Sequence, residues 1–264
     1  MSEKLIEVKN VSYSVESDNL SFRKKDSANI LFDISFSVNE KEILGICGES
    51  GGGKSTLAKL IAGIIQPING ELILNTKIGT QKNKPREIQI LFQNSSYLIN
   101  PYRKINTIIT EALKLADLKK EKIEDEKNKL VELININPVL LDRRGLGLSG
   151  GERQRIALAR LLAVKPKVLI LDEPFSAQDI SSQINFVKLL KKINEEMGVT
   201  IICVSHDLRI LRSLTDRIII LKEGRIVETG TTENVFTNPQ HSYTKFLLSA
   251  ESLELSYEDI QKRN

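Results

Sequence analysis

The sequence predicts an α/β fold in which short buried strands alternate with helices. One observation is that apolar, β-branched runs of strand length recur at Val168–Leu171, Val199–Val204 and Arg217–Leu221. Another is the helical spacing of apolar residues over Ile180–Met197, between the first two runs. A third is a glycine-rich segment that directly follows the apolar run Glu42–Cys47 and precedes a helical pattern. Strand, glycine loop and helix in this order are typical of a βαβ unit.

The composition indicates one globular domain with a sizeable insertion. The chain has 264 residues, of which 41% are apolar, enough for a substantial core. The 38 basic and 34 acidic residues give a net charge of only +4, which does not indicate a nucleic-acid partner. Trp is absent and aromatic residues make up 5%, which argues against a stacking surface for single strands. We therefore expect no nucleic acid among the partners.

Targeting signals and membrane spans are not evident in the sequence. No apolar run approaches the roughly 18 residues that a bilayer-spanning helix requires. The first ten residues, MSEKLIEVKN, contain no apolar signal region, so we expect no export by that route. Cys47 and Cys203 form neither a CxxC pair nor a metal-binding spacing, which favours a reduced, cytoplasmic protein.

The elements that flank the glycine loop follow from local patterns. Leu5–Val11 is rich in residues that favour strands, and Ile30–Val38 alternates between two sets of side chains, so both predict strands. The polar stretch Glu16–Asn29 predicts a loop insertion, whose basic cluster Arg23–Lys25 is expected to face solvent. After the glycine loop, apolar residues recur at helical spacing from Leu57 to Ile64.

The middle of the chain is predicted to be helical. Amphipathic patterns predict helices at Lys104–Ala116, Glu121–Asn135 and Arg153–Ala163. We therefore expect a helical insertion at about 94–160 within a domain that spans 1–250, followed by a charged tail at 251–264.

The glycine-rich segment GESGGGKST satisfies the phosphate-loop pattern GxxxxGK[ST]. Glycines let backbone N–H groups converge on an anion, and the following helix directs its positive end at the same phosphates. Lys54 would reach the β- and γ-phosphates, and Ser55 would ligate Mg²⁺. The strand before the loop and the helix after it argue against a chance glycine-rich turn. The candidate nucleotide-binding residues are Gly48, Glu49, Ser50, Gly51, Gly52, Gly53, Lys54, Ser55 and Thr56.

Two carboxylates end the buried run VLILDE. Open α/β sheets bind ligands at the carboxyl ends of their strands, which suits Asp172 as a ligand of Mg²⁺. Glu173 follows where the chain leaves the strand and could polarise a water molecule toward the γ-phosphate. Taken alone, the run is equally well explained as a strand followed by an acidic turn, but the phosphate loop upstream favours the catalytic interpretation.

The segment LSGGERQR directly precedes a helical pattern. Ser149 is a candidate N-cap residue, with Glu152 at capping-box spacing. A helix that begins with Ser-Gly-Gly is equally a second anion-binding site. The residues themselves leave both interpretations open.

LSGGERQR resembles the signature of ATP-binding cassette (ABC) ATPases, and further landmarks of that family occur in order. Gln93 in ILFQNS matches the Q-loop glutamine, Asp179 in SAQD matches the D-loop and His206 in VSHD matches the switch histidine. Tyr13 stands at the position of the aromatic residue that stacks on adenine. The resemblance covers 5–250. It implies a P-loop NTPase core with an N-terminal antiparallel β subdomain and an inserted α-helical subdomain.

The resemblance also implies roles for these residues. Glu173, His206 and Gln93 would be catalytic, with His206 at the γ-phosphate and Gln93 at Mg²⁺ or the attacking water. The alternatives are that His206 caps a helix or lies on the surface, that Gln93 is an ordinary strand-end amide, and that Tyr13 packs on the sheet. The family binds ATP between two subunits, so the second subunit's nucleotide would meet Ser149, Gly150, Gly151 and Asp179.

The C-terminal stretch GRIVETGTTENVFTNPQHSYTKFLLSA resembles the tail of ATPases that serve bacterial peptide and nickel importers. The matching residues are Pro239, His241, Tyr243, Thr244 and Leu247. The alternative is that the tail only packs a terminal helix on the core. The resemblance implies an ATP- and Mg²⁺-dependent ATPase that powers import of peptides or nickel, with a metal-chelate importer or an exporter as the alternative transporters.

The implied partners are a second ATPase subunit, two transmembrane permease subunits and an external substrate-binding protein. A heterodimer is expected, although a homodimer is also possible, at the cytoplasmic side of the plasma membrane. Three other classes are less consistent with the sequence. A GTPase lacks support because no NKxD-type motif is present. An ABC ATPase that acts on DNA or ribosomes usually needs long coiled coils or two cassettes, and 264 residues hold neither. A non-hydrolytic module is disfavoured because Glu173 and His206 are both intact.

Overall fold

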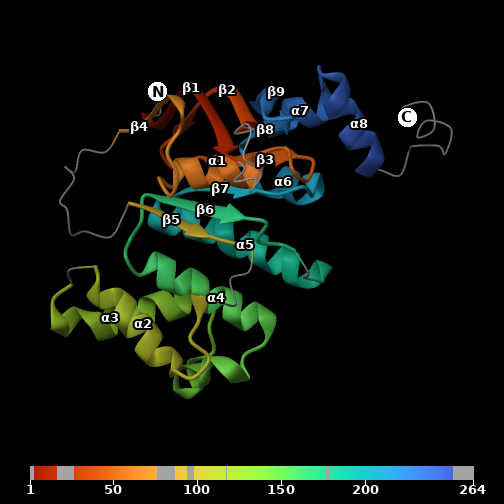
Figure 1. Ribbon diagram of the computed structural model, residues 1–264. Helices are drawn as coiled ribbons and strands as arrows, with labels where there is room; N and C mark the ends of the chain where they lie inside the picture. The colour runs from red at the N-terminus through yellow and green to blue at the C-terminus, as the bar shows by residue number, and fades with distance from the viewer. Residues whose placement is uncertain are drawn as a thin grey trace, which may run out of the picture. The chain divides into compact units, whose positions relative to one another are not determined.

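The computed structural model describes residues 3–16, 27–75, 87–93, 98–116, 118–176 and 179–251 (Figure 1). The chain divides into two compact units. Unit 1 comprises Met1–Asn75 and Cys203–Asn264, and unit 2 comprises Thr76–Ile202. The predicted cluster Arg23–Lys25, much of the predicted loop around it and the tail at 252–264 lie outside the described residues.

Unit 1 contains a three-stranded antiparallel sheet. Its strands are β1 (Lys4–Glu16), β2 (Ser27–Asn39) and β4 (Asn69–Leu74), in the order β2-β1-β4. The antiparallel part of the predicted fold class is therefore confirmed. Both predicted strands extend further than their β-branched cores, and β4 was not predicted because its residues are exposed or half-buried and give little apolar signal.

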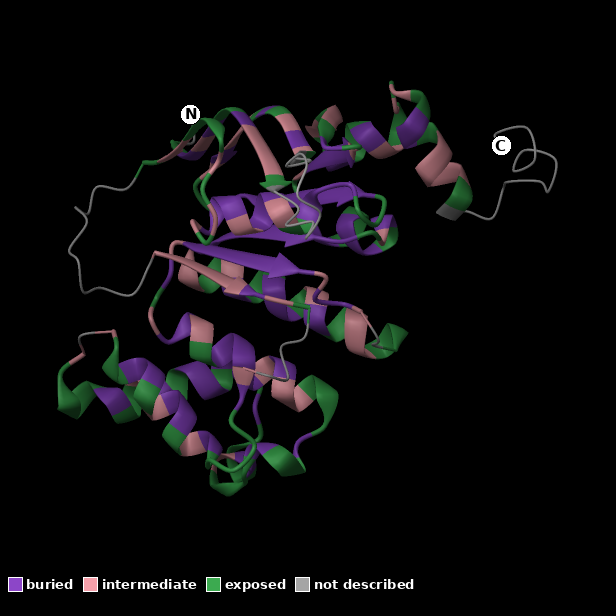
Figure 2. Ribbon diagram, in the orientation of Figure 1, coloured by how far each residue is buried: buried purple, intermediate pink, exposed green. Residues whose placement is uncertain are grey.

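A second, mixed set of strands in unit 1 carries the phosphate loop. Strand β3 (Ile43–Gly48) pairs in parallel with β8 (Arg217–Lys222), and β8 pairs in antiparallel with β9 (Arg225–Thr231). Every residue of β3 is buried, and Figure 2 shows both β3 and β8 largely in purple. Strands covered on both faces have continuous apolar runs, which is why Ile218–Leu221 could be predicted.

Four helices accompany these strands within the described part of unit 1. They are α1 (Lys54–Ile61), α6 (Leu208–Leu214), α7 (Thr232–Thr237) and α8 (Ser242–Glu251). The predicted continuation of α1 to Ile64 is wrong. Gly63 adopts a φ of 66°, a left-handed conformation that ends helices, and Ile64 is 49% exposed.

Unit 2 contains the parallel pair β5 (Ile88–Leu91) and β6 (Val168–Asp172). Leu91 is paired with Leu171, so the residues that follow the two strands emerge at the same edge. Strand β7 (Thr200–Val204) runs across the boundary between the two units in the sequence and is buried throughout.

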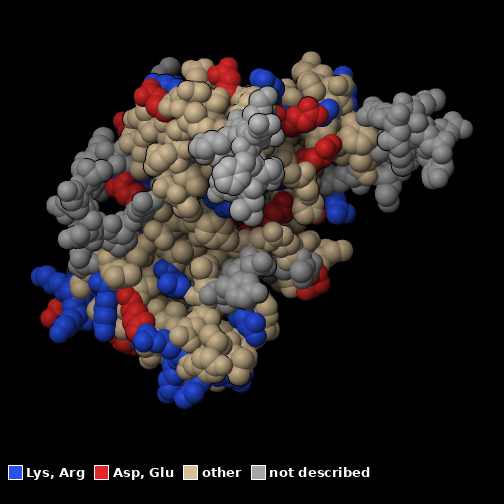
Figure 3. All heavy atoms as spheres, viewed as in Figure 1, with Lys and Arg blue, Asp and Glu red and all other residues tan. Residues whose placement is uncertain are grey.

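The helices of unit 2 confirm the helical patterns in the middle of the chain. They are α2 (Ile105–Lys114), α3 (Lys120–Leu133), α4 (Gly150–Leu162) and α5 (Ile180–Met197), with short 3-10 turns at Pro138–Asp142 and Gly145–Gly147. Figure 3 shows basic side chains, interspersed with acidic ones, over the part of unit 2 that contains α2 and α3. The boundaries of a helical subdomain at 94–160 stay a prediction.

Candidate functional site

The phosphate loop connects buried strand β3 to helix α1, as the sequence predicted. A Cβ atom on Gly48 would lie 2.0 Å from the backbone oxygen of Leu221, which only glycine avoids. Gly53 has a φ of 94°, and a Cβ there would lie 2.7 Å from a methyl group of Leu31. A larger residue at either position would push the loop off its supporting strands. The glycines are thus required by backbone packing as well as by room for an anion.

Lys54 opens helix α1 and is only 6% exposed. Its Nζ donates hydrogen bonds to the backbone oxygens of Gly48 and Glu49, each at 2.8 Å. The N-cap of the helix is Gly53, which has no side chain to accept the first-turn N–H groups. A buried ammonium group and an uncapped helix start are both suited to binding phosphate.

A cavity of about 500 Å³ in unit 1 opens on this loop. Its wall is formed by the loop, the start of α1, strand β2 and the turn between β8 and β9. The lining residues include Ile30, Phe32, Gly51, Lys54, Ser55 and Glu223. A cavity of this size has room for a nucleotide-sized ligand.

Tyr13 lies half-buried on β1, paired with Leu31. Leu31 stands between Ile30 and Phe32, which line the cavity together with Asn29 of the same strand. Tyr13 is not among the residues that form the cavity wall. Its contact with adenine stays a prediction.

His206 lies close in the fold to the strand that enters the phosphate loop. The N–H of Ser205 donates to the backbone oxygen of Ile46, two residues before Gly48, at 3.1 Å. Asp207, not His206, caps helix α6, because its Oδ1 accepts from the N–H of Arg209 at 3.0 Å. The interpretation of His206 as a helix cap is therefore wrong. His206 is exposed at the end of the strand, and its role at the γ-phosphate stays a prediction.

Asp172 and Glu173 end strand β6 in unit 2, as predicted. Asp172 is 5% exposed. Glu173 is half-buried and has a φ of 50°, a left-handed conformation that is unfavourable for a non-glycine residue. Its backbone oxygen accepts hydrogen bonds from the N–H of Ser176 at 3.4 Å and the hydroxyl of Ser176 at 3.0 Å, which hold the turn. Backbone strain of this kind concentrates at functional sites.

Gln93 lies at the same edge of unit 2. It follows β5, whose Leu91 pairs with Leu171 of β6, so the register brings Gln93 alongside the Asp172–Glu173 end. Gln93 is exposed. The structure thus brings together three of the predicted residues within unit 2, while the sequence NSSY that follows, 94–97, lies outside the described residues.

The predicted capping box at the start of α4 is confirmed. Ser149 Oγ accepts the N–H of Glu152 at 3.3 Å, and Glu152 Oε2 accepts the N–H of Ser149 at 2.7 Å. Among the residues that the structure describes, a Cβ on Gly150 or Gly151 would meet no atom within 4 Å, so none of them crowds this helix start. The cap and an anion site are therefore compatible with each other.

Asp179 caps helix α5 in unit 2. Its Oδ1 accepts the N–H of Ser182 at 2.9 Å and its Oδ2 accepts the hydroxyl of Ser182 at 2.6 Å. The side-chain hydrogen bond from Ser182, with that from its N–H, lowers the pKa of Asp179. The neighbouring positions 177–178 of the D-loop lie outside the described residues.

Sequence reasoning missed Gln154 of helix α4. Gln154 is 7% exposed, and its Nε2 donates a hydrogen bond of 2.6 Å to the backbone oxygen of Pro174. Pro174 directly follows Glu173, so the signature helix is joined to the turn that holds the candidate base. The only available signal was the position of Gln154 inside LSGGERQR.

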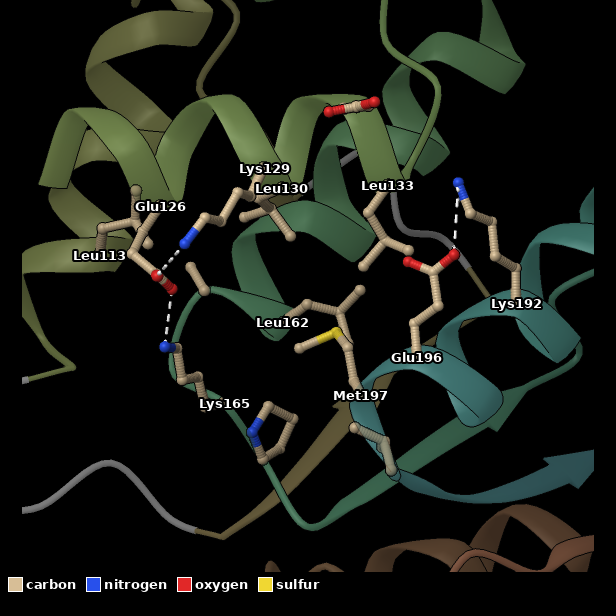
Figure 4. A pocket seen from close by; sticks show the side chains of 14 residues that line it. Leu113, Glu126, Lys129, Leu130, Leu133, Leu162, Lys165, Lys192, Glu196 and Met197 are labelled. Atoms are coloured by element: carbon tan, nitrogen blue, oxygen red, sulfur yellow. Dashed lines mark hydrogen bonds and ion pairs between the residues drawn. The ribbon is translucent and has the colours of Figure 1, made fainter. Parts of the chain in front are cut away.

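A second cavity, of about 580 Å³, lies in unit 2 between α3, α5 and the end of α4 (Figure 4). Ion pairs on its rim join Glu126 to Lys165 at 2.6 Å and Glu196 to Lys192 at 3.8 Å. None of the predicted site residues lines it. Its apolar wall includes Leu130, Leu133, Leu162 and Met197.

The buried strand, glycine loop and uncapped helix of unit 1, together with the acidic strand end of unit 2, define a P-loop nucleotide-binding protein. Comparison with known proteins makes the assignment specific. Residues 31–176 match the family model described as ABC transporter. The oligopeptide transport ATP-binding protein OppF of Haemophilus influenzae is 36% identical over 259 residues, which cover 94% of this chain and 78% of that protein.

Solved structures agree with this sequence match. CbiO1 of Clostridium perfringens, part of the ABC transporter complex CbiONQ, is 26% identical and superposes with a TM-score of 0.77 over 99% of this chain and all of that one. The dimeric ATP-binding cassette MJ0796, in a post-hydrolysis state with ADP and phosphate, is 25% identical with a TM-score of 0.69 over 86% of this chain and 98% of that one.

The chain belongs to the ABC transporter family. The resemblance seen in the sequence and the predicted fold class are confirmed, and the chain is an ATPase that binds ATP.

Proposed function

We propose that this protein is the ATP-hydrolysing subunit that powers a peptide importer. The observation that carries the proposal is the match to an oligopeptide transport ATP-binding protein along 94% of the chain. The similarity of its C-terminal stretch to such ATPases supports the same group. A dipeptide transport ATP-binding protein of Haemophilus influenzae is also 38% identical over 87% of the chain.

The proposed assembly pairs this chain with a second ATPase subunit, expected to be a different chain, on two transmembrane permease subunits. An external binding protein would deliver the cargo. Across the residues that the structure describes, no helix combines the length and the hydropathy needed to cross a bilayer. The proposed location is the cytoplasmic side of the plasma membrane, which the similarity to transport ATP-binding proteins supports.

In the proposed mechanism, the loop Gly48–Thr56 binds the triphosphate and the Lys54 ammonium moves from the Gly48 and Glu49 oxygens to the β- and γ-phosphates. His206 contacts the γ-phosphate and Tyr13 stacks on adenine. Glu173 takes the proton from the water that attacks the γ-phosphate.

The proposed Mg²⁺ ligands are Ser55, Gln93 and Asp172. Their hydroxyl, amide and carboxylate oxygens are the hard donors that Mg²⁺ prefers, and the buried carboxylate of Asp172 is the only charged group among them. When bound, Mg²⁺ offsets negative charge on the β- and γ-phosphates.

The signature completes the site of the second subunit in this proposal. Ser149, Gly150 and Gly151 are exposed, and within the described part of the chain no atom lies within 4 Å of a Cβ position on the two glycines. The helix start would bind the γ-phosphate of a nucleotide held by the other subunit's loop. Asp179, at the exposed start of α5, would face the same partner.

An uptake experiment tests the proposed cargo. Deletion of the gene is expected to abolish uptake of labelled oligopeptides, and the wild-type gene is expected to restore it while a Glu173→Gln copy does not. Parallel assays with Ni²⁺ and with metal chelates distinguish the other cargoes. Unchanged peptide uptake in the deletion strain would contradict the proposal.

Replacing Ser149 with alanine tests the shared site. We expect Ser149→Ala to lower ATP hydrolysis by the assembled complex about tenfold or more, because it removes a phosphate contact as well as a helix cap. Glu152→Ala breaks the same capping box but is not proposed to touch nucleotide, so it is the matched control. Steady-state hydrolysis and thermal unfolding are measured for both. Equal losses of activity in the two variants would show that Ser149 acts only as a helix cap and does not bind nucleotide.

A further inference from the structure

Helix α8 begins at a fixed point on strand β9. The carboxylate of Glu228 accepts the N–H of Gln240 at 2.8 Å and the N–H of His241 at 3.0 Å. His241 Nδ1 in turn accepts the N–H of Tyr243 at 3.1 Å. Burial alone would raise the pKa of Glu228, but these backbone donors hold it below its usual value, so the carboxylate is charged at neutral pH. These hydrogen bonds therefore fix the start of α8 to strand β9.

This anchoring brings Tyr243 to the phosphate loop. Tyr243 is 5% exposed, and its hydroxyl accepts the N–H of Glu49 at 3.0 Å across 194 positions of sequence. The Lys222 ammonium lies 5.1 Å from the centre of the Tyr243 ring, a cation–π distance. Burial raises the pKa of Tyr243 to about 12, so the phenol stays neutral near pH 7.

Glu49 is the residue through which this contact reaches the rest of the loop. Its backbone oxygen accepts from the Lys54 Nζ at 2.8 Å and from the N–H of Gly52 at 3.1 Å. The Glu49 N–H thus donates a hydrogen bond to Tyr243 of α8. The carbonyl of the same residue accepts hydrogen bonds from Lys54 and Gly52 of the phosphate loop. A shift of Glu49 would displace both.

We propose that Tyr243 is a positioning residue of the phosphate loop, which holds the Glu49 N–H so that the loop is preorganised for ATP. The hydrogen bond to the Glu49 N–H comes from the C-terminal segment, which lies outside the region 31–176 that matches the family model. It is therefore additional to what the glycines of the phosphate loop provide. The C-terminal helix therefore has a direct role in nucleotide affinity in addition to packing.

Tyr243→Phe in the full-length chain tests this proposal. The ring and its cation–π contact remain, and only the hydroxyl is lost. We expect the Kd for ATP to rise about fivefold, as the loss of one hydrogen bond predicts. Exchange of the Glu49 amide proton, followed by NMR, should become faster by a similar factor. Tyr102→Phe is the matched control, because Tyr102 is 74% exposed, and it should change neither quantity.

A second variant separates positioning from folding. Glu228→Gln weakens the anchor of α8 without touching the ring, and we expect a smaller rise in the Kd for ATP, in the same direction. Thermal unfolding of each variant reports on packing. If both variants bind ATP like the wild type and the Glu49 amide exchanges at the wild-type rate, Tyr243 is a packing residue only and the proposal fails.

Discussion

Replacing Glu173 with glutamine is expected to lower ATP hydrolysis by about 100-fold or more while ATP binding is retained. The amide has nearly the shape of the carboxylate but cannot take a proton from the attacking water. The turn should persist, because its hydrogen bonds from Ser176 go to the Glu173 backbone oxygen and not to the side chain. The hydrolysis rate of the assembled complex and the Kd for ATP measure the two effects separately.

The control for this variant is Glu132→Gln, an exposed glutamate on α3 of the same unit. It removes the same charge at a site that we do not expect to contact ATP, so both quantities should remain at wild-type values. Hydrolysis at the wild-type rate by Glu173→Gln would exclude Glu173 as the general base.

Replacing Lys54 with methionine is expected to weaken ATP binding by about 100-fold. Methionine fills most of the volume of the lysine stem, so the loss isolates the ammonium group. The estimate corresponds to about 3 kcal/mol for a hydrogen-bonded charge on phosphate. In the absence of nucleotide the same change leaves the Gly48 and Glu49 oxygens without this donor, and a modest loss of stability should accompany it.

Lys59→Met on the same helix is the control for the net charge of α1. Lys59 lies in the last turn of α1, away from the loop. Equilibrium titration with ATP should give the wild-type Kd for this variant. A Lys54→Met protein that binds ATP as tightly as Lys59→Met would show that the loop does not use its lysine as proposed.

The sequence was sufficient to predict the elements whose residues are buried on a regular period. Strands β3, β6 and β8 have buried, β-branched runs, and the bounds of α5 match the predicted Ile180–Met197 because Asp179 caps its start and Gly198 ends it. Strands β4 and β9 are half-exposed and lack such a run, so they were not predicted. The apolar pattern alone predicts a start of α4 at Arg153, three residues late, because glycine disfavours helices, whereas the predicted Ser149 cap is consistent with the observed start at Gly150.

The features of the candidate site also differ in whether the sequence could predict them. The phosphate loop, the acidic strand end and the capping box follow from short segments with fixed spacing. The hydrogen bonds of Gln154 to Pro174 and of Tyr243 to Glu49 join residues that are far apart in sequence. Such contacts depend on how helices pack on strands, which local patterns do not encode. The tail pattern includes Tyr243 but does not indicate which residue it contacts.

The hydrogen bond between Gln154 and Pro174 has a mechanical consequence. About one and a half turns of helix separate Ser149 from Gln154, and a helix is stiff over that length. In the proposed dimer, tension applied where Ser149 grips the opposite nucleotide would be transmitted along α4 to the peptide behind Glu173. Hydrolysis at the two catalytic centres would then be coordinated. A substitution in one signature would also slow hydrolysis at the centre whose general base comes from the same chain.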